Sequence, residues 1–210
     1  SNLSSTQLNL MQTSDVAALS TTAVASLTST QLNALNSTNL EALSTGQVAA
    51  LTTTQASNLT GAQLNLMQTS DIAALSTTAA ASLTSTQLNA LSSTNLEALT
   101  TTQVAKLTTT QVSNLTSTQL NLMQTTDVAA LTTTQVASLT GTQLDGLDAT
   151  HLGAVSTAQV TGLTSTQLNA LSSTNLEALT TTQVAKLTTT QVSNLSSTQL
   201  NLMQTSDVAA

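Results

Sequence analysis

The residues best suited to metal or acid–base chemistry gather at one place, where the single histidine, His151, follows Asp145 and Asp148. Imidazole and carboxylate groups are ordinary zinc ligands, but a structural zinc site needs four ligands and a catalytic one three. One histidine and two carboxylates are a weak metal signal. The alternative interpretation, which we favour, is that Asp148 caps the start of a helix and His151 is the third residue of that helix.

Four other acids, Asp15, Asp71, Asp127 and Asp207, each follow the motif Met-Gln-Thr-Ser/Thr. They occur once per group of repeats and never in pairs, whereas calcium sites and glycosidases need converging carboxylates. We interpret them as charges in the first turn of a helix, where the dipole favours them. The chain has no second histidine for a Ser-His-Asp set and no Gly-rich phosphate loop. We therefore expect no enzyme activity, no cofactor, and no catalytic, cofactor-binding or metal-binding residue.

Composition excludes further classes of function. The formal net charge is −7, with two Lys or Arg residues and no aromatic residue, so we expect no nucleic-acid partner. No apolar run approaches the ~20 residues that span a bilayer, so we expect no membrane insertion. Disulfides are excluded because there is no cysteine. Hydrophobic residues still make up 40% of the chain, which indicates an ordered fold rather than a disordered one.

An eight-residue repeat, here called an octad, runs without insertion or deletion from residue 3 to residue 210, after two preceding residues. Positions 1 and 6 of each octad are apolar, and position 5 is most often Gln. We predict one uninterrupted array of 26 octads with no linker, part of a longer repeat array. The octads fall into groups at residues 3–58, 59–114 and 115–194, and residues 195–210 begin the next group. The third group carries three extra octads, Leu139–Gly162.

Three local structures compete for the octad. Positions 1 and 6 have opposite parity, so in one β-strand they would face opposite sides. A β-solenoid with a corner in each octad remains an alternative, although no Gly or Asn-Gly corner recurs. A continuous helix is disfavoured, because eight residues at about 100° each turn the apolar stripe by about 80° per octad.

A short helix in each octad fits every position. In Leu99–Lys106, Thr100 is placed to cap a helix and Gln103 to reach back to the cap, as in the capping box Ser/Thr-x-x-Gln. Leu99 and Val104 then form the hydrophobic staple around the cap. Such short helices are marginal alone, so they must stack with positions 1 and 6 inward. The sequence therefore predicts an all-α solenoid. The groups of seven and ten octads differ by three, which hints at three octads per coil but leaves their number open.

The runs Leu99–Leu107 (Leu-Thr-Thr-Thr-Gln-Val-Ala-Lys-Leu) and Leu43–Leu51 (Leu-Ser-Thr-Gly-Gln-Val-Ala-Ala-Leu) resemble octapeptide repeat tracts of giant, adhesin-like bacterial surface or secreted proteins. The resemblance implies an extracellular or cell-surface location and a structural or adhesive role. We accordingly expect part of a filament, stalk or surface layer that self-associates by repeat stacking. The alternative is a ligand-binding surface, in which a Ser/Thr ladder binds ice, a glycan or another surface ligand.

Overall fold

The computed structural model describes residues 3–203 and folds them into 25 short α-helices, with no strand among these residues. The all-α prediction is confirmed and the β-solenoid alternative is wrong for the described chain. Most of the octad at residues 203–210, including Asp207, lies outside the described residues. The chain divides into two compact units, Ser1–Leu107 and Thr108–Ala210, and each is described by itself.

Octad 1 is Leu3–Leu10, and each helix carries the number of its octad. The helices of the first unit are α1 (Ser5–Asn9), α2 (Thr13–Ala18), α3 (Thr21–Ala25), α4 (Ser29–Asn33), α5 (Ser37–Glu41), α6 (Thr45–Ala49), α7 (Thr53–Asn58), α8 (Gly61–Leu66), α9 (Thr69–Ala74), α10 (Thr77–Ala80), α11 (Ser85–Ala90), α12 (Ser93–Glu97) and α13 (Thr101–Val104). The helices of the second unit are α14 (Thr109–Ser113), α15 (Ser117–Leu122), α16 (Thr125–Ala130), α17 (Thr133–Ala137), α18 (Gly141–Asp145), α19 (Ala149–Ala154), α20 (Thr157–Thr161), α21 (Ser165–Asn169), α22 (Ser173–Glu177), α23 (Thr181–Val184), α24 (Thr189–Ser193) and α25 (Ser197–Leu202).

Each helix starts where the sequence predicts. Before α13, Thr100 is extended (φ −78°, ψ 152°), and its side chain accepts a hydrogen bond from the backbone N–H of Gln103. A hydroxyl in this place satisfies one of the helix's free N–H groups. After the helix, position 1 of the next octad returns to extended backbone, as at Leu59 (φ −61°, ψ 141°). No residue from 3 to 203 has a positive φ, so these turns need no glycine.

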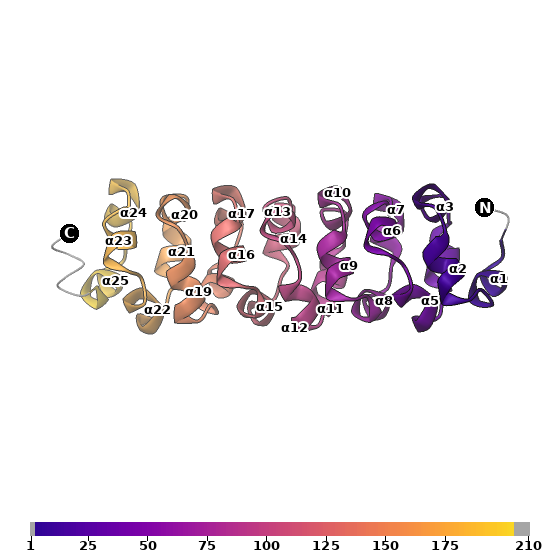
Figure 1. The fold of residues 1–210 in the computed structure, drawn as a ribbon. Coiled ribbons are helices and arrows are strands. Elements are labelled where there is room, and N and C mark those ends of the chain that lie inside the picture. The colour runs from indigo at the N-terminus through magenta and orange to yellow at the C-terminus, as the bar shows by residue number, and fades with distance from the viewer. Residues whose placement is uncertain (1–2, 204–210) are drawn as a thin grey trace. The chain divides into compact units, whose positions relative to one another are not determined.

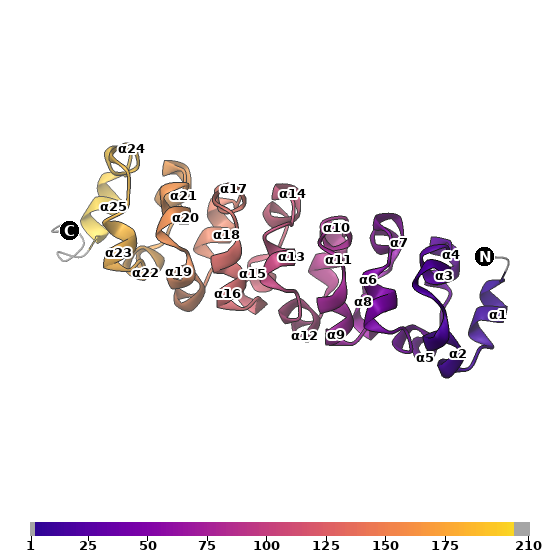
Figure 2. The same ribbon diagram turned by 45° about the horizontal axis from the view of Figure 1, so that its top comes forward.

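The helices wind in coils of three octads, or 24 residues. In the first unit every helix from α1 to α10 packs on the helix three places further along, and in the second unit α14 packs on α17 and α16 on α19 (Figure 1). The same stacking within each unit can be followed from a second direction (Figure 2). The number that the sequence left open is therefore three.

The apolar core runs through the coils. Position 6 is fully buried in most coils, as at Leu64 and Val104 (both 0% exposed), and position 1 is nearly so, as at Leu99 (3%). The prediction that positions 1 and 6 face inward is confirmed. None of the helices between residues 3 and 203 combines the length and the apolar character that crossing a membrane requires.

Candidate functional site

Buried polar groups meet where one coil stacks on the coil before it. We call this interface the coil seam, formed by the position-5 side chains of one coil and the backbone carbonyls of the preceding coil. From Asn39 onward, position 5 carries a polar side chain that is at most 8% exposed, with Ala79 as the described exception. Polar groups buried this deeply need hydrogen-bond partners.

Gln103 shows how the seam is built. The backbone N–H of Thr100 donates to its Oε1 over 2.7 Å, which completes the capping box. Its Nε2 donates to the carbonyls of Ile72 (2.9 Å) and Leu75 (2.7 Å) in the preceding coil. One buried amide therefore both starts its own helix and joins two coils, and it leaves few of its polar atoms unpaired.

The same bonds recur along each unit. Within the described residues, eight glutamines besides Gln103 donate from Nε2 to carbonyls 31 and 28 residues earlier, namely Gln47, Gln55, Gln87, Gln143, Gln159, Gln167, Gln183 and Gln191. The acceptors are the carbonyls of position 6, in the last turn of the helix, and of position 1, just after it. The position-6 carbonyl also accepts a backbone N–H, as Ile72 does from Leu75 (3.3 Å).

The sequence contains a signal for this second role, which the capping box alone does not explain. A capping box accepts Glu as readily as Gln, yet Glu occupies position 5 in no octad. Gln is the commonest residue there, and Gln, Asn and His all carry an N–H donor, which a carboxylate lacks. Asp occurs there only in the Met-Gln-Thr-Ser/Thr-Asp octads, whose position-2 Gln brings an amide of its own. The preference indicates that position 5 must usually donate as well as accept.

In the Met-Gln-Thr-Ser/Thr-Asp octads the amide and the acceptor change places, with Gln at the capping position 2 and Asp at position 5. Asp71 is 2% exposed and accepts from the backbone N–H of Gln68 over 3.2 Å, while the Gln68 side-chain amide donates to the Glu41 carbonyl (3.4 Å). Burial raises the pKa of Asp71 and of Asp127, and the backbone hydrogen bond to each lowers it less. Both acids and the exposed Asp15 lie in the first helical turn, as predicted.

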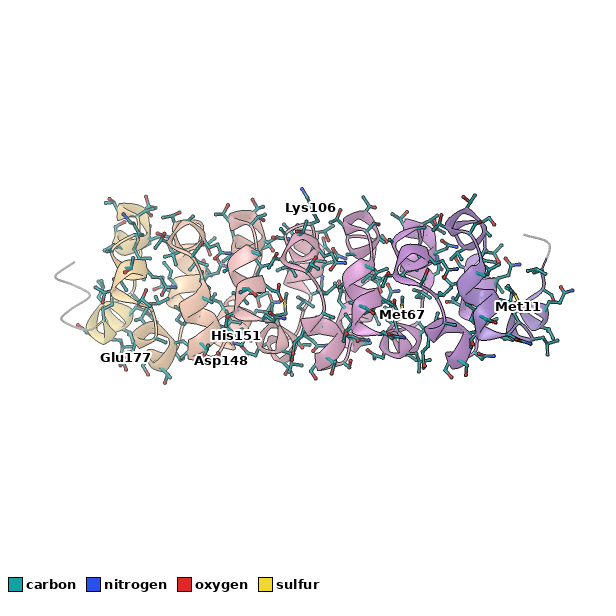
Figure 3. The ribbon with its side chains drawn as sticks, in the orientation of Figure 1. Met11, Met67, Lys106, Asp148, His151 and Glu177 are labelled. Atoms are coloured by element: carbon teal, nitrogen blue, oxygen red, sulfur yellow. The ribbon has the colours of Figure 1, made fainter. Side chains whose placement is uncertain are left out.

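His151 occupies position 5 and fills the seam as Gln does. Asp148 caps α19 and accepts from the backbone N–H of His151 (2.9 Å), which confirms the capping interpretation. The ring Nδ1 lies 2.8 Å from Oδ1 of the neighbouring Asp148 (Figure 3). Nε2 lies 2.8 Å from the Met123 carbonyl in the preceding coil. Backbone and ring hydrogen bonds from His151 lower the pKa of Asp148.

Asp145 does not join His151. Its carboxylate accepts instead from the backbone N–H of Ser172 (2.6 Å) in the next coil. Burial would raise the pKa of Asp145, but the hydrogen bonds from Ser172 and Asn175 together outweigh it and lower the pKa. No group of three or more His, Asp or Glu side chains is placed to hold a metal ion within the described residues.

One family model matches the chain, that of the ALTTAQ repeat, over residues 8–45, 24–61, 64–101 and 156–189, together more than half of the chain. Five of the six letters of that description match Ala98–Gln103, with Thr102 in place of the second Ala, from position 8 of one octad through the cap to the position-5 glutamine of the next. No curated protein matches the chain.

Proposed function

We propose, from the premise that this chain belongs to the ALTTAQ repeat family, that it is a structural protein of an extracellular bacterial filament, stalk or surface layer. Its role is mechanical and not catalytic: stacked coils provide length and regular spacing. The extracellular, adhesin-like setting rests on the resemblance of the octads to surface-protein repeats. The observation that carries the proposal is the repeating seam, in which successive coils within each unit stack through the same positions of the octad.

The seam also supports self-association between copies. Position 6 is buried when another coil covers it, as at Val112 (0% exposed) and Leu120 (1%), but Val192 and Leu200 in the last described coil are 41% and 43% exposed. Any further coil, whether of the same chain or of a second copy, would offer these side chains the same apolar partners. Contacts of this head-to-tail kind do not close on themselves, so they extend into filaments.

We therefore expect the 210-residue chain to form oligomers or fibres that light scattering and negative-stain microscopy detect. The matched variant Val192→Asp/Leu200→Asp places charges on the exposed face, and we expect it to stay monomeric and folded. A wild-type chain that remains a monomer at high concentration would contradict the proposal. Equal association of the wild type and the variant would show that another surface is responsible.

A second candidate function is supported by one surface. Position 4 of every third octad in the first unit carries an exposed threonine, at Thr6, Thr30, Thr54, Thr78 and Thr102. Position 2 is used for capping, whereas position 4 is not, so this column could contact ice or a glycan. Thermal hysteresis or glycan-array binding that is lost in Thr54→Lys/Thr78→Lys would favour this candidate over the structural role, which predicts neither activity.

A further inference from the structure

A second set of hydrogen bonds joins successive coils, from the N–H of a helix cap to a side chain of the preceding coil. Whether a cap makes this bond is related to the residue at position 5 of its octad. Where position 5 is Gln, its Oε1 usually accepts the N–H of the capping residue, as Gln63 does for Thr60 (2.9 Å). In α25, which carries Gln199, the N–H of Ser196 donates instead to Asn169 Oδ1 (2.9 Å). Asn and His are shorter or differently shaped, and the helices α5, α12, α19 and α22, which carry them, have no such reciprocal bond to the cap. The cap N–H of each of those four helices therefore has no side-chain acceptor within its own helix.

In all four helices the acceptor is an Asn or Asp at position 7, four octads earlier. The N–H of Asn36 donates to Asn9 Oδ1 (2.8 Å), and the N–H of Ser92 donates to Asn65 Oδ1 (2.8 Å). In the second unit the acceptors for the N–H groups of Asp148 and Ser172 are Asn121 Oδ1 (3.0 Å) and Asp145 Oδ1 (2.6 Å). Each acceptor lies 27 residues before its donor, in the preceding coil.

Asn33 shows what happens when the cap four octads later already has an acceptor in its own octad. Asn33 also stands at position 7, and its Nδ2 donates to the Asn58 carbonyl (2.7 Å), as Asn65 donates to Ala90 (2.7 Å). Its Oδ1, however, is buried without a partner, because the N–H of Thr60 is already bonded to Gln63.

The three extra octads, Leu139–Gly162, keep the pairing of position-7 acceptors with cap N–H groups, both with the octads before them and with the octads after them. They are one coil long, and in the second group Asn65 and Ser92 are separated by four octads. The matching residues of the third group, Asn121 and Ser172, are separated by seven because the extra coil lies between them. In that coil, Asp145 accepts the hydrogen bond from the N–H of Ser172, and the N–H of Asp148 donates to Asn121.

We propose that position 7 of one octad and position 5 of the fourth octad after it form a docking code that determines which coil stacks on which. Among the described residues, every Asn or His at position 5 is matched by an Asn or Asp at position 7, whereas a Gln at position 5 can bond its own cap and does not require that partner, although Asn169 also accepts the cap N–H of the octad that carries Gln199. Leu139–Gly162 is then a one-coil unit that can be inserted or deleted without depriving the N–H of any of these caps of its acceptor. This inference does not depend on the proposed extracellular role.

Hydrogen exchange at single amides tests the code. We expect Asn65→Ala to speed exchange of the Ser92 amide by about tenfold or more, since that N–H loses its hydrogen-bond acceptor. Asn33→Ala removes a side-chain bond of the same length but should leave the Thr60 amide unchanged. In the background Asn95→Gln, whose longer side chain can reach the cap, Asn65→Ala should no longer affect Ser92. An unchanged Ser92 in the single variant, or equal effects at Ser92 and Thr60, would overturn the code.

Two deletions provide an independent test. Removing residues 139–162 brings Asn121 four octads before Ser172, so we expect a thermal midpoint close to that of the full chain. Removing only residues 139–146 places Ser113 and Ala137 at the acceptor positions for Asp148 and Ser172, and neither carries an amide or a carboxylate. The smaller deletion should therefore lower the midpoint more.

Adding His151→Gln and Asn175→Gln to the smaller deletion should recover most of the loss, because both caps then have their own glutamine. Equal midpoints for the two deletions, or no recovery with the glutamines, would overturn the proposal.

Discussion

Leu120→Asp is expected to unfold the coils around α15 and to lower the free energy of unfolding by about 5 kcal/mol. Leu120 is 1% exposed at position 6, and the charge would have no partner among the apolar side chains there. Urea denaturation followed by circular dichroism measures the loss.

Leu200→Asp is the matched control. The six residues Ser197–Leu202 are identical to Ser117–Leu122, but Leu200 is 43% exposed. At protein concentrations low enough for the chain to be monomeric, we expect this variant to lose less than about 1 kcal/mol, as exposed substitutions usually do. Similar losses in the two variants would mean that local sequence, and not coverage by a neighbouring coil, sets the cost.

Gln103→Glu is expected to lower the free energy of unfolding by about 3 kcal/mol at neutral pH. Glu retains the oxygen that accepts from the Thr100 N–H, but its carboxylate would face the carbonyls of Ile72 and Leu75 without a donor. The exposed Gln7 makes the same box with Ser4 (2.8 Å), and no coil in the described chain precedes it, so Gln7→Glu should be nearly neutral.

The cost of Gln103→Glu should depend on pH. Burial raises the pKa of Asp71 at the same position, and we expect it to raise the pKa of the new carboxyl above its unfolded value. The penalty is then full above the raised pKa and is lost as the pH falls through it, because the protonated acid can donate to a carbonyl. Urea midpoints at pH 8 and pH 4 measure this. A pH-independent loss, or an equal loss for Gln7→Glu, would contradict the role of the amide at the seam.

The local fold was predictable because each octad contains its own instructions. The cap, the box and the staple lie within six residues, as in Leu99–Val104, so neighbours in the chain suffice to determine where a helix begins. The inward direction of positions 1 and 6 followed from the same register.

The seam was less predictable because it joins residues 27 to 31 positions apart. Octads that look alike give no direct sign of which one stacks on which, so three octads per coil was only a hint. The absence of Glu at position 5 indicated a donor, but not its acceptors at Ile72 and Leu75. The partnership of Asn65 with Ser92 becomes visible only once the coil length is known.

The coil of three octads is the basis of every contact at the seam, and a disulfide tests it directly. The chain has no native cysteine, and Thr133 Cβ lies 3.4 Å from the place where a Cβ on Gly162 would stand. A disulfide needs the two Cβ atoms about 3.5–4.5 Å apart. We expect Thr133→Cys/Gly162→Cys to cross-link readily under mild oxidation.

Gly162 stands at position 8 of its octad, and the residues at position 8 of the preceding and following octads, Ala154 and Ala170, provide control pairs for the cross-link. In Thr133→Cys/Ala154→Cys the cysteines are two octads apart, and in Thr133→Cys/Ala170→Cys four. Coils of three octads predict that only the pair with Gly162→Cys forms a disulfide in the folded monomer. Preferential cross-linking of either other pair would contradict a coil of this length.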